Sequence, residues 1–169
     1  MENLRPDLSY RLLLSAHGLP KRVIAKGDPY QWQVERTAQA LVDRLGIKNL
    51  DWNVCYQSRV GPLKWLEPST DAEIRRAGVE GKGVVVAPIA FVSEHSETLV
   101  ELDIEYGKLA RDAGVRDYRR AATVSAAPAF IEGLAGLVRK ALAEGGCIND
   151  DGMRICPAQF RRCGYREGA

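Results

Sequence analysis

Short, mostly apolar runs alternate with longer amphipathic segments along most of this chain. The apolar runs, each short enough for a buried strand, cover residues 10–15, 52–57, 83–87 and 118–124. Apolar residues recur at helical spacing in the segments 30–45, 71–77, 93–114 and 129–143. Strands that alternate with helices predict an α/β fold, here a four-stranded parallel sheet with helices on both faces in a Rossmann-type, three-layer arrangement.

Helix-starting and helix-ending residues support these boundaries. Asp28 suits the N-cap and Pro29 the first helical position before the helix at 30–45, and Ser93, followed by Glu97, predicts a helix start after the third strand. The segment 118–124 is the least apolar strand, which favours a sheet edge. The pair Gly145-Gly146 stops the last helix, so we expect one α/β domain over residues 1–145 and a cysteine-containing tail over 146–169.

Composition narrows the class of protein. The chain has 169 residues, 46% of them hydrophobic and 27% charged, which suits one globular domain with a full core. Its net charge of +2 gives no reason to expect nucleic-acid binding. No apolar run reaches the ~20 residues of a membrane span, and the first residues lack the apolar core of a signal peptide. We therefore expect a cytoplasmic protein, with peripheral membrane contact left open.

Both histidines of the chain follow predicted strands. His17 comes after the first strand and His95 after the third. Ligands of open α/β sheets bind at the carboxyl ends of the strands, so both positions are candidates for a binding site. No Gly-x-Gly-x-x-Gly follows the first strand and no Gly-Lys-Ser/Thr loop is present, which removes the dinucleotide and phosphate-loop fingerprints.

A row of carboxylates follows the third strand. Glu97, Glu101 and Glu105 lie four residues apart, so a helix would stack them along one side. A solvated helix face is the simple interpretation. The alternative is cation handling, because histidine and carboxylates together are common metal ligands.

The loop at residues 57–65 carries a second candidate feature. Arg59, Lys64 and Trp65 could contact a flat, anionic ligand through two cations and an indole ring. A packed surface loop is the alternative.

Four motifs, in this order, give the chain a family resemblance. They are Leu14-Ser15-Ala16-His17-Gly18-Leu19-Pro20, Gly27-Asp28-Pro29-Tyr30, Tyr56-Gln57-Ser58-Arg59-Val60-Gly61-Pro62, and the stretch from Pro88-Ile89-Ala90-Phe91 to Tyr106. With them the chain resembles the ferrochelatases, lyases that insert ferrous iron into a porphyrin in haem biosynthesis. The resemblance covers about residues 10–142 and matches the C-terminal half of the family's two-domain chain, which implies a chelatase-like α/β fold.

The resemblance implies roles for seven residues. His17 and Glu97 correspond to the catalytic pair on either side of the porphyrin plane, and His17, Glu97, Glu101 and Glu105 to the groups that bind or pass the metal. Ser58 and Trp65 match porphyrin-facing positions, and His95 accompanies the motif as a supporting residue. Fe²⁺ and a porphyrin would be the substrates; the choice between protoporphyrin and coproporphyrin stays open.

The resemblance also bears on the tail and on partners. Some members bind a [2Fe–2S] cluster, which usually needs four thiolates, and Cys147, Cys156 and Cys163 would supply three. Free thiols in a disordered tail are the alternative. A partner, either a second half-domain or a second copy, would complete the cleft. The other hypotheses are an orphan half that binds metal or porphyrin without turnover, and a truncated product without activity.

Overall fold

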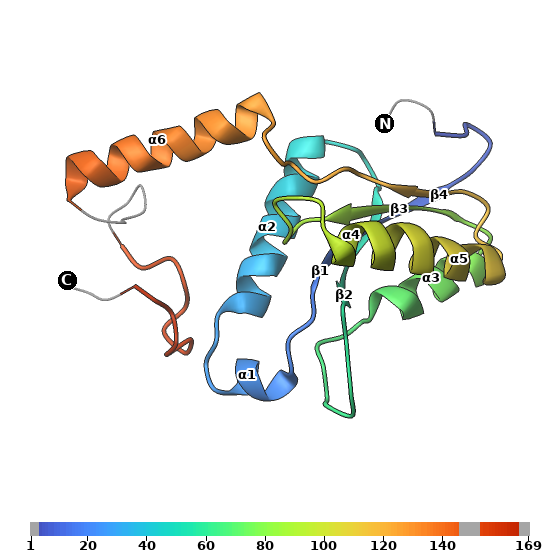
Figure 1. The fold of residues 1–169 in the computed structure, drawn as a ribbon, viewed down its shortest axis with the longest axis horizontal. Coiled ribbons are helices and arrows are strands. Elements are labelled where there is room, and N and C mark those ends of the chain that lie inside the picture. Colours follow the sequence, from blue (N-terminus) through green and yellow to red (C-terminus); the bar gives the residue numbers. More distant parts are fainter. Residues whose placement is uncertain (1–3, 146–152, 166–169) are drawn as a thin grey trace.

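The computed structural model describes residues 4–145 and 153–165, and its centre is a four-stranded parallel sheet (Figure 1). In the order β2-β1-β3-β4, the strands are Asp51–Gln57, Tyr10–His17, Gly83–Pro88 and Tyr118–Arg120. The helices are α1 (Lys21–Ala25), α2 (Tyr30–Leu45), α3 (Thr70–Val79), α4 (Ser96–Thr98), the π-helix η1 (Leu99–Glu105), α5 (Tyr106–Asp112) and α6 (Pro128–Glu144). The predicted fold class is confirmed.

Each face of the sheet has its own apolar core. Leu13 of β1 packs with residues of α3, η1 and α5 on one face, including Ile74, Leu102 and Ala110. Ala16, three residues along the same strand, belongs to a second cluster with Val34 of α2 on the other face. Because side chains of a strand alternate between faces, a strand covered on both sides is apolar throughout, which explains the continuous run in β1.

The helix after β3 starts later than the sequence predicts. It begins at Ser96, and its N-cap is His95 instead of Ser93. The His95 Nδ1 accepts a hydrogen bond from the backbone N–H of Glu97 at 3.1 Å, and the Thr98 hydroxyl accepts one from the backbone N–H of His95 at 2.9 Å. This reciprocal capping box satisfies N–H groups that the first helical turn leaves without intrahelical partners.

Two predictions for the C-terminal part need correction. The fourth strand ends at Arg120, because the residues after it turn to the loop beyond β3, where the Ser125 N–H donates to the Val92 carbonyl at 2.6 Å. Helix α6 has the predicted bounds to within a residue, but it lies away from the sheet (Figure 1) and none of its residues is buried. Its apolar side is largely exposed, at Leu134, Leu137, Val138 and Leu142.

The described part of the tail, residues 153–165, folds back on the start of α2. The Phe160 ring lies 6.2 Å from the Trp32 ring, and the Arg162 N–H donates to the Gly27 carbonyl at 3.0 Å. The predicted domain boundary falls beside residues 146–152, which are outside the described part of the chain. Among the described residues, no helix is both long and apolar enough to cross a bilayer.

A network of ion pairs lies at the end of the sheet where β1 begins. Arg11 is 3% exposed, and its guanidinium binds Asp51 at 3.0 Å and Glu80 at 2.8 Å. The hydrogen bond from Arg11, with a second from Lys82, lowers the pKa of the Glu80 carboxyl to about 2. In the folded protein the Glu80 carboxyl therefore stays ionised at pH values well below its ordinary pKa.

We expect Glu80 to make unfolding depend on pH in acid. The pKa of this carboxyl is 4.5 as a free group and about 2 when folded. Between these values the unfolded chain binds more protons, so the free energy of unfolding falls as the pH drops from about 4.5 to about 2. The Glu80→Gln variant should show a flatter pH dependence in urea unfolding over that window. Glu132→Gln, which changes an exposed carboxyl on α6, should match the wild type; equal slopes for Glu80→Gln and wild type would contradict the assignment.

Candidate functional site

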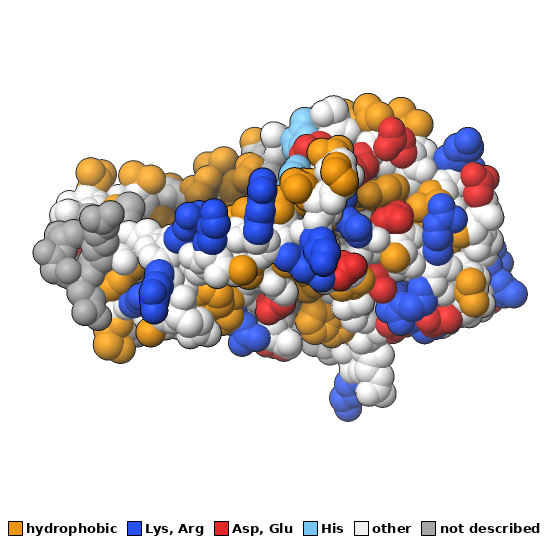
Figure 2. Space-filling model, turned by 90° about the horizontal axis from the view of Figure 1, so that it is seen from below, with side chains coloured by type: hydrophobic (Ala, Val, Ile, Leu, Met, Phe, Trp, Pro, Cys, Tyr) orange, Lys and Arg blue, Asp and Glu red, His pale blue; other side chains and the backbone are white. Residues whose placement is uncertain are grey.

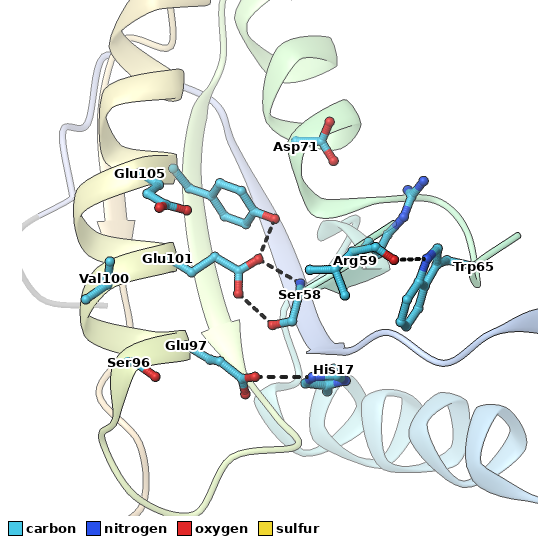
Figure 3. A pocket seen from close by; sticks show the side chains of 12 residues that line it. His17, Ser58, Arg59, Trp65, Asp71, Ser96, Glu97, Val100, Glu101 and Glu105 are labelled. Carbon is cyan, nitrogen blue, oxygen red and sulfur yellow. Dashed lines mark hydrogen bonds and ion pairs between the residues drawn. The ribbon is translucent and has the colours of Figure 1, made fainter. Parts of the chain in front are cut away.

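A cavity of about 770 Å³ opens where the carboxyl ends of β1 and β2 face α4 and η1 (Figure 3). Its size falls within the range of small-molecule sites. It is lined by all six residues predicted for the metal and porphyrin, namely His17, Ser58, Trp65, Glu97, Glu101 and Glu105. On the surface, the histidines lie beside carboxylate and hydrophobic side chains (Figure 2).

The His17 and Glu97 side chains point toward each other and are in contact at the cavity (Figure 3). A macrocycle does not fit between them in this arrangement, so the expected placement on either side of the porphyrin plane is not what the structure has. The His17 Nε2 lies 3.3 Å from the Glu97 Oε1, and each side chain is 39% exposed. His17 is the last residue of β1, where the Tyr30 hydroxyl donates to its carbonyl at 2.8 Å. Among the described residues the Glu97 carboxylate has no other side-chain partner. The two groups thus form an accessible pair on two different elements.

The contact between His17 and the Gly18 carbonyl determines which ring nitrogen is free to accept a proton or bind a metal ion. The His17 Nδ1 lies 2.8 Å from the Gly18 carbonyl, which can only accept, so Nδ1 carries a proton. Nε2 then faces a carboxylate oxygen, and a proton between the two atoms would make that contact attractive. A divalent cation between the two groups would serve the same electrostatic purpose. The pair is therefore suited to exchange a proton for a metal ion.

His95 acts on the backbone next to this pair. Its Nδ1 caps the helix at the N–H of Glu97, and its ring packs against Phe91 with centroids 5.1 Å apart. It does not line the cavity. His95 therefore contacts the backbone of the residue that faces His17 and not the cavity itself; its supporting role stays a prediction.

Glu101 differs from Glu97 because both of its oxygens are fully engaged. Oε1 accepts from the backbone N–H of Ser58 at 2.7 Å and from the Tyr106 hydroxyl at 2.9 Å. Oε2 accepts from the Ser58 hydroxyl at 2.6 Å and from the Gln57 Nε2 at 3.1 Å. A carboxylate has about four lone-pair positions, so none remains for a metal in this arrangement.

The Glu101 carboxylate also holds a strained turn. Ser58 has a φ of 59°, a left-handed conformation that costs a non-glycine residue energy. Its N–H and hydroxyl both bind Glu101, which offsets that cost. Burial, together with the charge of Glu101 and the hydrogen bond to it, raises the pKa of the Tyr106 hydroxyl, so Tyr106 stays a donor.

The four predicted metal ligands do not close into one coordination set. Among the described residues, no three histidine, cysteine, aspartate or glutamate side chains lie together as an ion-binding group. Glu97 and Glu105 line the cavity on the same helical run, while Glu101 between them is bonded to the β2 end. All three glutamates of the predicted row line the cavity, and Glu97 in addition contacts His17.

The loop after β2 forms the wall opposite the acidic helix. Trp65 Nε1 donates to the Val60 carbonyl at 3.2 Å, which folds the loop onto itself. Gly18 allows it to pack closely, because a Cβ there would lie 2.9 Å from the Gln57 carbonyl oxygen. Arg59 lines the cavity, but Lys64, grouped with it in the sequence, does not.

Two residues of the site were missed as functional candidates from the sequence. Gln57 is fully buried and donates to both the Glu101 carboxylate and the Glu97 carbonyl. Tyr106 is the other donor to Glu101. Gln57 could have been found from the strand register, because it pairs directly with His17 at the end of β1. Tyr106 lies beyond the π-helix, whose wider turn the residue spacing does not reveal.

Two of the three tail cysteines predicted as ligands of a [2Fe–2S] cluster lie in the described part of the chain. Cys147 lies outside the described residues. Cys156 is buried near the start of α2, 3.8 Å from the Gln33 amide, and it adjoins Cys163. Two thiols do not make a four-thiolate ligand set, and the described residues contain no third side chain that completes an ion-binding group with them. The described residues thus supply two neighbouring thiols and not a complete ligand set, and a cluster stays a prediction.

Comparisons of sequence agree on one family. The family model described as ferrochelatase matches residues 1–142. A ferrochelatase of Caulobacter vibrioides (strain NA1000 / CB15N) is 57% identical over 161 residues, which cover 94% of this chain and 46% of the relative. A ferrochelatase of Rickettsia bellii (strain OSU 85-389) is 48% identical, covering 93% of this chain and 45% of its own. The chain thus spans about half the length of the curated relatives it matches.

A solved structure supports the fold alone. A cobalamin (vitamin B12) biosynthesis CbiX protein from Marinobacter aquaeolei VT8 aligns with a TM-score of 0.59 and 20% sequence identity. The alignment covers 80% of this chain and 99% of that chain. The same parallel α/β arrangement therefore occurs in a protein of very different sequence.

The four hydrogen bonds of Glu101 lead to a prediction about stability. Glu101→Gln replaces one acceptor oxygen with an NH₂ group that faces donors, so it should lower the free energy of unfolding by about 2 kcal/mol. Glu105→Gln is the matched control, because its side chain has no hydrogen-bond partner among the described residues, and its effect should stay within about 0.5 kcal/mol. Urea unfolding of both variants measures the difference. Equal stabilities would show that the Glu101 carboxylate does not hold the turn.

Proposed function

The chain belongs to the ferrochelatase family, and we propose that its cavity takes part in inserting ferrous iron into a porphyrin. The observation that supports this proposal most directly is the His17–Glu97 pair. An imidazole nitrogen and a carboxylate oxygen 3.3 Å apart, both accessible from the cavity, can handle protons and a divalent cation at the same place.

The proposed chemistry exchanges two protons for one metal ion. A neutral porphyrin loses its two pyrrole protons as Fe²⁺ enters, so the product is also neutral. His17 takes pyrrole protons at Nε2, because Nδ1 already donates to the Gly18 carbonyl. Glu97 stabilises the resulting imidazolium and passes the proton outward, since its carboxylate is 39% exposed. Removing the base should cost about 10²–10⁴-fold in rate.

Iron reaches the pair along the acidic helix in this proposal. Glu105 and Glu97 both offer carboxylate oxygens to the cavity, and carboxylates bind ferrous iron without excluding its later release. Glu101 joins this route only by giving up hydrogen bonds, so its main role is to fix the Ser58 turn that the macrocycle would contact.

The opposite wall recognises the macrocycle. Trp65 presents an indole to the cavity, and Ser58 lies at its floor beside Glu101. Arg59 also lines the cavity and makes no ion pair among the described residues, so its guanidinium can bind a carboxylate substituent of the ring. This combination of a flat surface and a cation suits a flat, anionic substrate.

We further propose that a second half-domain or a second copy of the chain supplies the missing wall. Relatives of this chain are about twice as long, and the described cavity has walls from one sheet edge only. A second copy of the chain or a separate half-domain would exclude water from the His17–Glu97 pair. Without such a partner, the same cavity would bind a metal or a porphyrin but would turn over poorly.

His17→Ala should reduce iron insertion at least 100-fold, because it removes the base at the macrocycle. Anaerobic metallation of a porphyrin by Fe²⁺, followed in the Soret band, measures the rate. His95→Asn is the matched control. It changes the other histidine, but keeps an acceptor for the Glu97 N–H, and should lose less than 10-fold. Metallation retained by His17→Ala would refute the role of His17. A wild-type Soret shift on porphyrin binding, without metallation, would favour the binding-only function.

The proposed pairing of two copies predicts that the metallation rate depends on protein concentration. If two copies form one cavity, the metallation rate per chain should rise with protein concentration, and sedimentation velocity should show a dimer over the same range. A strict monomer with constant specific activity would exclude the second copy. A monomer that gains activity only when a separate half-domain is added would identify the other partner.

A further inference from the structure

Arg120 connects three elements that surround the loop before α4. It is the last residue of the edge strand β4, and its side chain is 12% exposed. Nε and Nη2 bind the two oxygens of Asp103 on η1, at 2.5 and 2.9 Å. Nη1 binds the Glu94 Oε1 in the loop at 2.9 Å. One planar guanidinium thus joins the sheet, the π-helix and the loop.

Glu94 fastens the loop to the segment that follows β4. The same Oε1 accepts from the backbone N–H of Thr123 at 3.0 Å. Burial alone would raise the pKa of this carboxyl, but the Thr123 N–H, the Thr98 hydroxyl and Arg120 outweigh it and lower the pKa to about 2. Glu94 therefore remains ionised throughout the ordinary pH range, and its bond to Arg120 is charge-assisted.

The loop position determines where Glu97 lies. Glu94 immediately precedes His95, whose ring caps the N–H of Glu97. On the other side, Gln57 donates to the Glu97 carbonyl at 2.7 Å. The Glu97 carboxylate itself is held only by His17 among the described residues. Its 3.3 Å distance to the His17 Nε2 thus depends on anchors applied to the backbone around it.

We propose that Arg120 is a positioning residue for the reaction, because it fixes the loop that leads into α4 and so sets where Glu97 meets His17. This inference rests on the proposed function in so far as the His17–Glu97 pair is the reacting pair. Arginine suits the position because its fork binds Asp103 through two parallel hydrogen bonds while a third N–H reaches Glu94. Lysine keeps the charge but cannot satisfy this geometry.

The test compares Arg120→Gln with Arg119→Gln. The neighbouring Arg119 is on the same strand, is 51% exposed and, within the described part of the chain, pairs only with Asp117, so its substitution is a matched loss of one positive charge. The first readout is the imidazole NMR signal of His17 in the folded chain without substrate. It should shift in Arg120→Gln and stay near the wild-type position in Arg119→Gln. Arg120→Lys should lie between the two.

The second readout is metallation kinetics. Displacing Glu97 should lower kcat by about 10- to 100-fold and change KM for the porphyrin little, because misplacing a reacting group mainly affects the chemical step. In a Glu97→Gln background, Arg120→Gln should cause little further loss, whereas a purely structural role would reduce the rate by the same factor in both backgrounds.

The outcomes separate this inference from the proposed function. Unchanged His17 signals in folded Arg120→Gln, or the same fractional loss in both backgrounds, would overturn the positioning role. If Arg120→Gln does not fold, Glu94→Gln, which keeps the Arg120–Asp103 pair, decides by the same two readouts. A wild-type chain that does not metallate porphyrin contradicts the proposed function, but the His17 signals still decide whether Arg120 positions Glu97.

Discussion

The parallel pairing of β1 with both of its neighbours is the constraint on which the rest of the structure depends. β1 lies between β2 and β3, and its register sets His17 directly beside Gln57. Because parallel strands end at the same edge, groups distant in the sequence meet there without any local signal. Gln57 then extends the connection to the acidic helix through Glu101. The cleft is therefore a product of the sheet and not of the loops alone.

Two carboxylates of one acidic row have taken different tasks. Glu97 keeps its oxygens accessible and faces a histidine, so it can exchange protons or metal. Glu101, four residues later, satisfies four donors and supports a left-handed Ser58. The same residue type is thus accessible from the cavity at one position and bound into the architecture at the next. The difference arises from the neighbours that the fold supplies, chiefly Gln57 and Tyr106.

Sequence patterns predicted the elements better than their ends and contacts. The helix at Tyr30–Leu45 is predicted to within a residue, because Asp28, Pro29 and Gly46 are strong local signals; the N-cap is Pro29, one residue after the predicted Asp28. The start at Ser96 was missed because histidine is an uncommon N-cap and the serine at 93 offered a more usual one. The family motifs point to the residues that line the cavity. The four hydrogen bonds that occupy the Glu101 carboxylate come from residues distant in the sequence or beyond the π turn, and residue spacing does not encode them.

The π-helical segment Leu99–Glu105 is bonded to the sheet through the Glu101 and Asp103 side chains. The number of residues in the segment therefore matters as much as which residues they are. A π turn closes its hydrogen bonds over five residues instead of four, so one deletion would allow a regular α-helix. Each residue of an α-helix turns by roughly 100°, so that deletion would rotate the helix before it relative to α5. Glu101 is tied to β2 and Asp103 to β4, and both ties would then face the wrong way. The number of residues in this segment therefore keeps the Glu101 and Asp103 contacts in register with the strands that they bind.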